Sequence, residues 1–238
     1  MFRNILMMFM FAASVAQAAW GDYEETRDLS LDADGKRLLR IEAGAGSLEI
    51  TGMSATGEIA VKAHIVVPGA NAEEARAILS DYMVLGLEMD GDAAALTAYF
   101  EDNGGIFRNS PKIDLEVSVP DGMSLDVEDG SGSVQIQNVA GEIELDDGSG
   151  SIQMTDIGGA IKLKDGSGSI SIEGAGQDVT IVDGSGSVTV ARVEGSVRIG
   201  DGSGSIDVRE VAGDLVIPDA GSGSVNFANI RGRVERAD

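Results

Sequence analysis

The residues best suited to chemistry are aspartates that recur at one fixed interval. A D-G-S-G-S pentad begins every eighteen residues, and a sixth copy carries one inserted residue, Ala220. The column consists of Asp129, Asp147, Asp165, Asp183, Asp201 and Asp219. Stacked carboxylates repel, so something must offset that repulsion. Either each side chain caps a backbone N–H of its own turn, or calcium bridges carboxylates and turn carbonyls. The sequence therefore predicts a column that caps turns or binds calcium, with no other cofactor.

The remaining residues offer little to an enzyme. His64 is the only histidine, and it lies in a predicted strand. The sequence contains neither G-x-S-x-G nor H-E-x-x-H. The G-x-G of each repeat lacks the third glycine and the following helix that phosphate binding needs. We therefore expect no catalytic and no cofactor-binding residues. A polysaccharide-cleaving solenoid stays open as an alternative, because paired carboxylates alone can act as acid and base.

The elements that position the aspartates are short strands. After each D-G-S-G-S pentad, apolar residues alternate with polar ones, as in Val188, Val190, Val197 and Ile199. Alternation at period two predicts strands with one buried face, and valine and isoleucine favour strands. Glycine accounts for 33 of 238 residues, which suits two tight corners per repeat. Each repeat is thus predicted to hold two strands and two glycine-bearing corners.

The exact periodicity favours a β-solenoid over a meander of antiparallel hairpins. In a solenoid each repeat is one coil and equivalent residues stack into columns, so a change in length would break every column. A narrow coil has room for aliphatic side chains but for few rings, and aromatic residues make up only 4% of the chain. We therefore predict an all-β fold, a parallel β-solenoid with eighteen-residue, two-strand coils over 129–238.

The preceding part of the chain is less regular. Residues 36–128 are predicted to form an irregular solenoid part that is continuous with the repeats, and 19–35 an N-terminal extension. The sequence Gly46-Ser47-Leu48-Glu49-Ile50 echoes the later repeats. One helix is predicted over about 71–83, because Asn71 and Glu74 make a capping box before an amphipathic stripe. We expect this helix to cover the open end or side of the sheet.

The first residues and the overall charge bear on location and partners. Residues 1–18 read as a signal peptide: a basic residue, a short apolar run, then Ala16-Gln17-Ala18. The chain is thus expected to be exported, to the periplasm or the cell surface, without a membrane span after cleavage. It has 40 acidic and 17 basic residues, a net charge of −23. That charge argues against nucleic acid and anionic membranes as partners. The absence of cysteine excludes disulfides.

A family resemblance rests on the segment before the repeats. The run from Ile113 to Gly122 is followed by Ser124-Leu125-Asp126-Val127 and then by Gly-Ser-Gly-Ser-Val. This pattern resembles the "putative adhesin" domain-of-unknown-function family of bacterial envelope proteins over roughly 36–235. It is also similar to the head domains of auto-transporter adhesins. The resemblance implies a β-solenoid, and because its motifs are structural it transfers no functional residues.

These observations together predict a non-enzymatic, adhesin-like binding or scaffold module of the bacterial cell envelope. Its partner would be an envelope protein or glycan, and we expect a monomer. Two alternatives remain at this stage. One is a carbohydrate-active β-solenoid enzyme, and the other is a periplasmic partner in an envelope signalling or stress response.

Overall fold

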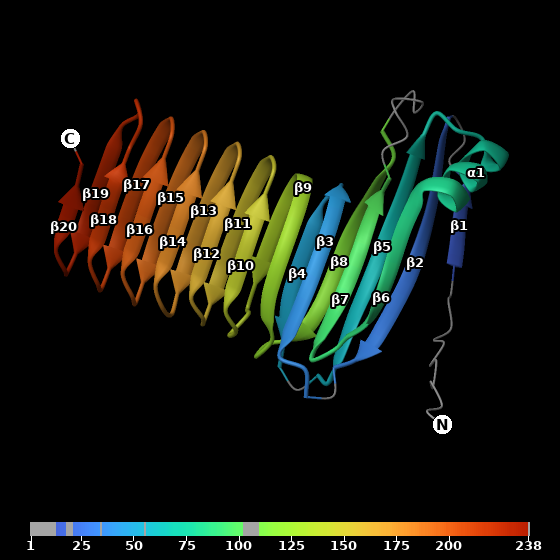
Figure 1. The fold of residues 1–238 in the computed structure, drawn as a ribbon, viewed down its shortest axis with the longest axis horizontal. Coiled ribbons are helices and arrows are strands. Elements are labelled where there is room, and N and C mark those ends of the chain that lie inside the picture. Colours follow the sequence, from blue (N-terminus) through green and yellow to red (C-terminus); the bar gives the residue numbers. More distant parts are fainter. Residues whose placement is uncertain (1–12, 18–20, 34, 55, 102–109, 238) are drawn as a thin grey trace.

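The computed structural model describes residues 13–17, 21–33, 35–54, 56–101 and 110–237 of the chain. Two sheets face each other along one axis, and the repeats stack as successive coils at one end of the molecule (Figure 1). We call them sheet A and sheet B, as defined by the strands below. The predicted β-solenoid is confirmed.

The repeats contribute one strand to each sheet per coil. Strand β9 (Ser124–Gln137) is long and belongs to both sheets, because its two halves pair with different neighbours. Sheet B continues through β10 (Ile143–Asp147), β12 (Ile161–Asp165), β14 (Val179–Asp183), β16 (Val197–Asp201), β18 (Leu215–Asp219) and β20 (Val234–Arg236). Sheet A continues through β11 (Gly150–Ile157), β13 (Gly168–Ala175), β15 (Gly186–Val193), β17 (Gly204–Val211) and β19 (Val225–Ile230).

Neighbouring coils pair in parallel and in register. Ile152 lies beside Ile170, which lies beside Val188, so each residue meets its equivalent eighteen positions on. Inward-facing side chains are aliphatic and buried; Ile152, Met154 and Leu163 are each at most 1% exposed. The core is therefore a set of aliphatic columns, and burial of these columns is the main favourable term that holds the coils together.

A further coil, formed early in the chain, stacks directly on the first repeat. Strands β3 (Leu38–Ala45) and β4 (Leu48–Met53) both pair in parallel with β9. Leu48 lies beside Val134 in that register. The expectation from Gly46-Ser47 that coils of the same kind begin here is thus confirmed.

Antiparallel strands extend both sheets beyond that coil. In sheet A, β8 (Lys112–Pro120) pairs in parallel with β4, and β5 (Glu58–Pro68) and β2 (Asp22–Asp32) follow in antiparallel order. In sheet B, β7 (Ala93–Phe100) pairs in parallel with β3, and β6 (Met83–Asp90) pairs antiparallel with β7. The N-terminal part is thus irregular in strand direction rather than in sheet continuity.

Helix α1 (Ala72–Tyr82) connects β5 in sheet A to β6 in sheet B. Asn71 caps it and forms the predicted capping box with Glu74. The buried residues of the helix are Ala75 and Leu79, which join the hydrophobic core. The helix lies at the end opposite the last coil (Figure 1). The apolar side of the helix packs against this end of the sheets, as the sequence predicted.

The predicted signal peptide falls mostly on residues outside the described ranges. Its described part is strand β1 (Ala13–Gln17), which pairs antiparallel with β2. Export and cleavage therefore stay predictions. No helix among the described residues is long and apolar enough to cross a membrane.

The two corners of each coil rely on special backbone conformations. At the D-G-S-G-S corner the second glycine has φ between +140° and +155°, from Gly132 to Gly204. A Cβ on Gly168 would lie 1.5 Å from the carbonyl oxygen of Gly150 in the preceding coil. No side chain fits there, so this corner requires glycine both for its conformation and for its close approach.

The opposite corner places one residue per coil in the left-handed region. These residues are Asn138, Asp156, Gly174, Arg192, Glu210 and Asn229, with φ from +55° to +83°. Gly, Asn and Asp tolerate this conformation, whereas residues with longer side chains adopt it only at a cost in free energy. Arg192 and Glu210 are therefore the two strained members of this column.

The glycine corner makes a sharp prediction. Gly168→Ala should cost roughly 3 kcal/mol or more of unfolding free energy, because the backbone of two coils would have to separate. Gly200→Ala is the matched control, since a Cβ there meets nothing within 4 Å. Denaturant unfolding followed by circular dichroism measures both. Equal stability of the two variants would contradict the close packing of the corners.

The left-handed residues at the opposite corner predict a substitution that increases stability. Glu210→Asn should raise the unfolding free energy by about 0.5–1 kcal/mol, because asparagine accepts the left-handed conformation at less cost. Asn138→Glu reverses the exchange at an equivalent corner and should lower stability by a similar amount. Thermal unfolding of both variants checks the pair, and a loss of stability in Glu210→Asn would refute this account of the corner.

Candidate functional site

The predicted aspartate column is a buried ladder along one inner corner of the solenoid. Its members are Asp129, Asp147, Asp165, Asp183 and Asp201, which lie beside one another in register from β9 to β16. Their exposed fractions are only 1–6%. We call these five residues the aspartate ladder. The sequence predicted the column, but it did not predict that the carboxyl groups lie inside the coil.

The sixth predicted member lies outside the ladder. The register of β18 against β16 shifts after Arg198, so that Asp219 pairs with Gly200, and Asp219 is exposed. Ala220, the inserted residue of the last repeat, is buried. The register shift, which lies between Val216 and Asp219, thus leaves Asp219 on the outside of the coil. Asp219 still caps its own turn by accepting the N–H of Gly221 at 3.0 Å.

One oxygen of each capping aspartate stabilises the following corner. The Oδ1 atoms of Asp147, Asp165, Asp183 and Asp201 accept the backbone N–H of the serine two residues on, at 2.9–3.2 Å. An Asx-type turn of this kind satisfies a donor that a tight corner leaves without a backbone partner. These four aspartates thus accept a backbone N–H of their own turns, and calcium binding stays a prediction.

The other oxygen of every ladder residue has no hydrogen-bond partner. The Oδ2 atoms of all five ladder aspartates are buried and unpartnered. A buried polar atom without a partner is costly, and an ionised carboxylate in that position is costlier still. The ladder thus carries an electrostatic strain that the capping hydrogen bonds do not remove.

The pKa values of the ladder respond to this environment. Burial, followed by the negative charge of the neighbouring Asp147, raises the pKa of Asp129 to about 7. Burial, together with the charges of Asp165 and Asp201, raises the pKa of Asp183 to about 6. Burial also raises the pKa values of Asp147, Asp165 and Asp201. Each member therefore favours the neutral acid more than an exposed aspartate does.

The ladder is not a preformed metal centre in the described part of the chain. No group of three or more His, Asp or Glu side chains there converges closely enough to hold a metal ion. Among the described residues the only other buried charged side chain is that of Glu25, which accepts hydrogen bonds from Tyr23 and Arg27 far from the ladder in sequence. The ladder residues are thus the sole concentration of buried charge in the described repeats.

The lone histidine lies on the outer surface of sheet A. His64 is 40% exposed, and its Nε2 is 3.8 Å from a carboxylate oxygen of Glu24. It borders a shallow depression of about 260 Å³ together with Asp114 and Glu116. The Asp114 carboxylate already accepts hydrogen bonds from Ser47 and Lys112. The arrangement contains no nucleophile held by His64, so nothing here completes a catalytic constellation.

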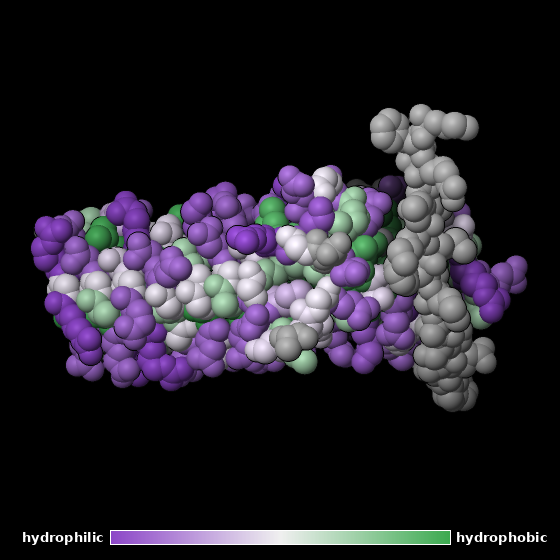
Figure 2. All heavy atoms as spheres, turned by 90° about the horizontal axis from the view of Figure 1, so that it is seen from below, coloured by the Kyte–Doolittle hydropathy of each residue, from purple (hydrophilic) through white to green (hydrophobic). Residues whose placement is uncertain are grey.

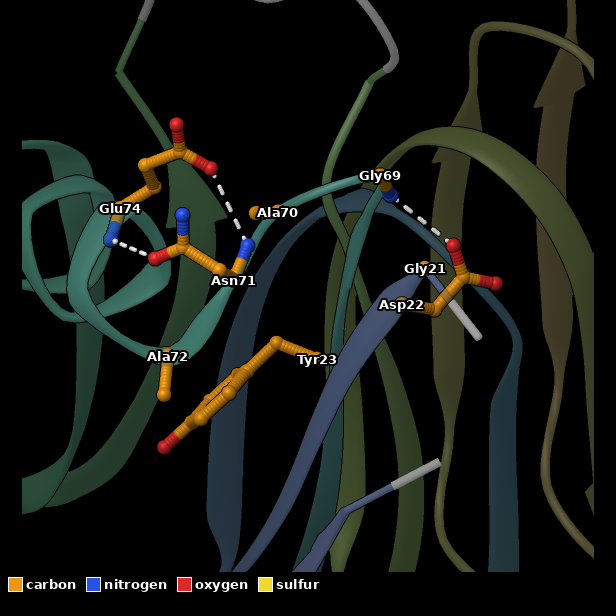
Figure 3. Close-up of a pocket in the computed structure, with 8 residues that line it drawn as sticks. All are labelled: Gly21, Asp22, Tyr23, Gly69, Ala70, Asn71, Ala72 and Glu74. Atoms are coloured by element: carbon orange, nitrogen blue, oxygen red, sulfur yellow. Dashed lines mark hydrogen bonds between the residues drawn. The ribbon is translucent and has the colours of Figure 1, made fainter. Parts of the chain in front are cut away.

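A larger depression of about 400 Å³ lies at the start of helix α1 (Figure 3). Several of the backbone N–H groups around it already have side-chain acceptors. Asn71 accepts the N–H groups of Glu73 and Glu74, and Asp22 accepts the N–H of Gly69 at 2.9 Å. Two carboxylates also line it, from Asp22 and Glu74. The negative charge of these two side chains, which also accept N–H groups of Gly69 and Asn71, disfavours an anion in the depression.

The outer faces of the two sheets carry polar columns in register. On sheet A the column is mainly uncharged and consists of Gln135, Gln153, Ser171, Thr189, Asp207 and Asn226. On sheet B the column has mixed charges and consists of Glu144, Lys162, Thr180, Arg198, Val216 and Glu235. Figure 2, which looks along the strands onto the corners of the coils, shows a pale central band of residues with hydrophilic residues on both sides of it. Both sheets thus offer broad, regularly spaced polar surfaces.

Comparison with known proteins assigns a family. A family model described as Toastrack DUF4097 matches residues 86–232, which is more than half of the chain. No curated protein matches the chain.

Solved structures give remote likenesses. One is titled a putative cell adhesion protein from Clostridium sporogenes, with 12% identity, a TM-score of 0.43, and coverage of 88% of this chain and 99% of that one. Another is titled a putative lipid binding protein from Parabacteroides distasonis, with 14% identity, a TM-score of 0.40, and coverage of 90% and 97%. A third is titled a putative adhesin from the same species, with 13% identity, a TM-score of 0.41, and coverage of 89% and 97%. At these identities and TM-scores the likenesses do not indicate what the chain does.

The capping role predicts a difference between two substitutions of one residue. Asp165→Asn keeps an acceptor for the Ser167 N–H, whereas Asp165→Ala leaves that donor without a partner. The alanine variant should therefore be less stable than the asparagine variant by about 1–2 kcal/mol. Urea unfolding at neutral pH compares the two directly. Equal stabilities would show that the hydrogen bond at the corner contributes nothing.

Proposed function

The chain belongs to the Toastrack DUF4097 family, and from that starting point we propose that it is an exported, non-enzymatic, adhesin-like binding or scaffold module of the cell envelope. The outer face of sheet A is the observation that supports this proposal most directly. Its mainly uncharged polar column, in which Asp207 is the one charged member, runs in register over six coils. Such a face presents evenly spaced hydrogen-bonding groups to an extended partner such as a glycan or a protein surface.

The position of the perturbed carboxyl groups argues against the enzymatic alternative. Glycoside cleavage needs an acid with a raised pKa beside the scissile bond. The carboxyl groups with strongly raised pKa values belong to the ladder, and they are at most 6% exposed. A polysaccharide on the outer surface could not reach them. The ladder therefore serves the interior of the solenoid rather than a substrate.

Binding of the sheet A face is tested with two matched variants. Thr189→Lys places a bulky charge on sheet A between Ser171 and Asp207, and Thr180→Glu places one on sheet B between Lys162 and Arg198. Neither new charge lies beside a like charge across the strands, so both variants should fold. On a glycan array probed with the chain lacking residues 1–18, Thr189→Lys should lose at least tenfold in affinity while Thr180→Glu retains binding.

The same assay separates the alternatives. Release of reducing ends from an arrayed polysaccharide would replace this proposal with the carbohydrate-active enzyme. Absence of glycan binding combined with recovery of a membrane sensor from envelope extract would replace it with the signalling partner. If only Thr180→Glu loses binding, sheet A is not the binding face.

A further inference from the structure

The aspartate ladder is isolated from any compensating charge. Strands β9, β10, β12, β14 and β16 carry it, and the inward side chains of the facing strands β11, β13, β15 and β17 are aliphatic. At one end Ala43 of β3 lies beside Asp129, and at the other Asp219 of β18 adds a further negative charge next to Asp201. Among the described residues, no lysine, arginine or histidine is buried.

The geometry offers each unpartnered oxygen one kind of nearby partner, the carboxyl group of the ladder residue in the next coil. Capping hydrogen bonds engage Oδ1 in four of the five members, Asp147, Asp165, Asp183 and Asp201, and Oδ2 of all five is without a donor. Successive coils are spaced by about 4.8 Å, so small side-chain rotations bring neighbouring carboxyl groups within hydrogen-bonding distance. Two ionised carboxylates repel at that range, whereas an acid and a carboxylate attract by sharing a proton.

From this placement we propose that the aspartate ladder is a buried binding site for protons, in which neighbouring aspartates of successive coils share them as acid–carboxylate hydrogen bonds. Each bound proton turns one ladder carboxylate into a donor for the unpartnered oxygen of its neighbour. The proton comes from solvent and returns to solvent, so no other group changes. A ladder that holds protons removes both the repulsion between coils and the cost of the orphan oxygens.

The linkage between proton binding and folding has a definite sign. An aspartate in the unfolded chain titrates near its ordinary value of 3.8, whereas Asp183 titrates at about 6 and Asp129 at about 7 in the folded protein. The folded state thus holds protons that the unfolded state releases between these values. Stability conferred by the ladder is complete below the unfolded value and is lost as the pH rises through 6 to 7.

The first experiment follows thermal unfolding from about pH 8 to about pH 5, at high ionic strength so that surface repulsion is screened. The wild-type midpoint should rise by about 5 °C on acidification. In Asp147→Asn/Asp183→Asn, no two ladder aspartates remain adjacent: Asp165 lies between two amides and Asp129 beside one, and these amides donate at every pH, while Asp201 keeps Asp219 on its other side. That variant should be more stable than the wild type at about pH 8 and lose most of the pH dependence.

Two further variants guard the interpretation. Glu194→Gln removes one exposed negative charge from a corner and should keep the wild-type slope. The single variant Asp183→Asn replaces the double variant if the latter fails to fold, and it should flatten the slope in part. If Glu194→Gln flattens the slope as much as Asp183→Asn does, the pH dependence belongs to general surface charge and the proposal is overturned.

A direct readout detects the protons themselves. Infrared difference spectra at neutral pH should show the carbonyl stretch of protonated carboxylic acid in the wild type and not in Asp147→Asn/Asp183→Asn. Its absence from the wild type would overturn the proposal. Calcium chloride against a chelator, and sodium against choline, provide the competing arm. A midpoint at about pH 8 that rises with either cation in the wild type but not in the double variant would show that the ladder holds cations instead.

Discussion

The structure depends on one constraint, which is that each coil must repeat the backbone path of the previous coil residue by residue. Backbone hydrogen bonds run between coils through the corners as well as the strands; the Gly166 N–H, for example, donates to the carbonyl oxygen of Asp147. Because the corners of the repeats are hydrogen-bonded too, one extra residue within a coil shifts the register of that coil. The last coil shows the effect: its pairing with β16 shifts between Arg198 and Gly200, so that Asp219 pairs with Gly200 and is exposed.

In-register stacking puts identical residues next to each other, and its effect depends on their chemistry. For valine and isoleucine it builds a continuous apolar column, which is favourable. For glycine it allows carbonyl groups of one coil to lie where a side chain of the next would otherwise be. For aspartate it places carboxyl groups in a row, which is unfavourable unless protons or cations intervene. The corner nevertheless needs an acceptor for the serine N–H, so each aspartate is kept for its turn at an electrostatic cost to the column. The formal charge of −23 therefore includes groups whose raised pKa values leave them partly neutral in the folded protein.

The sequence predicted the features that arise from local or periodic patterns. The eighteen-residue period specified coils and columns, and Asn71 with Glu74 specified the start of the helix. The inward orientation of the aspartates was not predictable in the same way. Each aspartate sits where a strand ends and a corner begins, and there the alternation of buried and exposed residues no longer dictates a side. Register between distant segments also escaped prediction: Gln137 donates to the Thr51 hydroxyl across eighty-six residues, because β5 to β8 and the helix are inserted between two coils that stack directly.

The same stacking divides the polar chemistry of the molecule into an inner and an outer part. Inside, carboxyl groups of the aspartate ladder accept hydrogen bonds from the corners and lie next to one another. Their raised pKa values are therefore a property of the fold. Outside, side chains such as those of Gln153, Ser171 and Thr189 are not needed to cap the backbone, because their backbone groups are already paired within sheet A. Substitution of these outer residues leaves the stacking intact, so the outer face can change its partner while the interior stays fixed. A solenoid of this kind separates stability from recognition by the direction in which each side chain points, and a change of ligand requires only a change in the outward column.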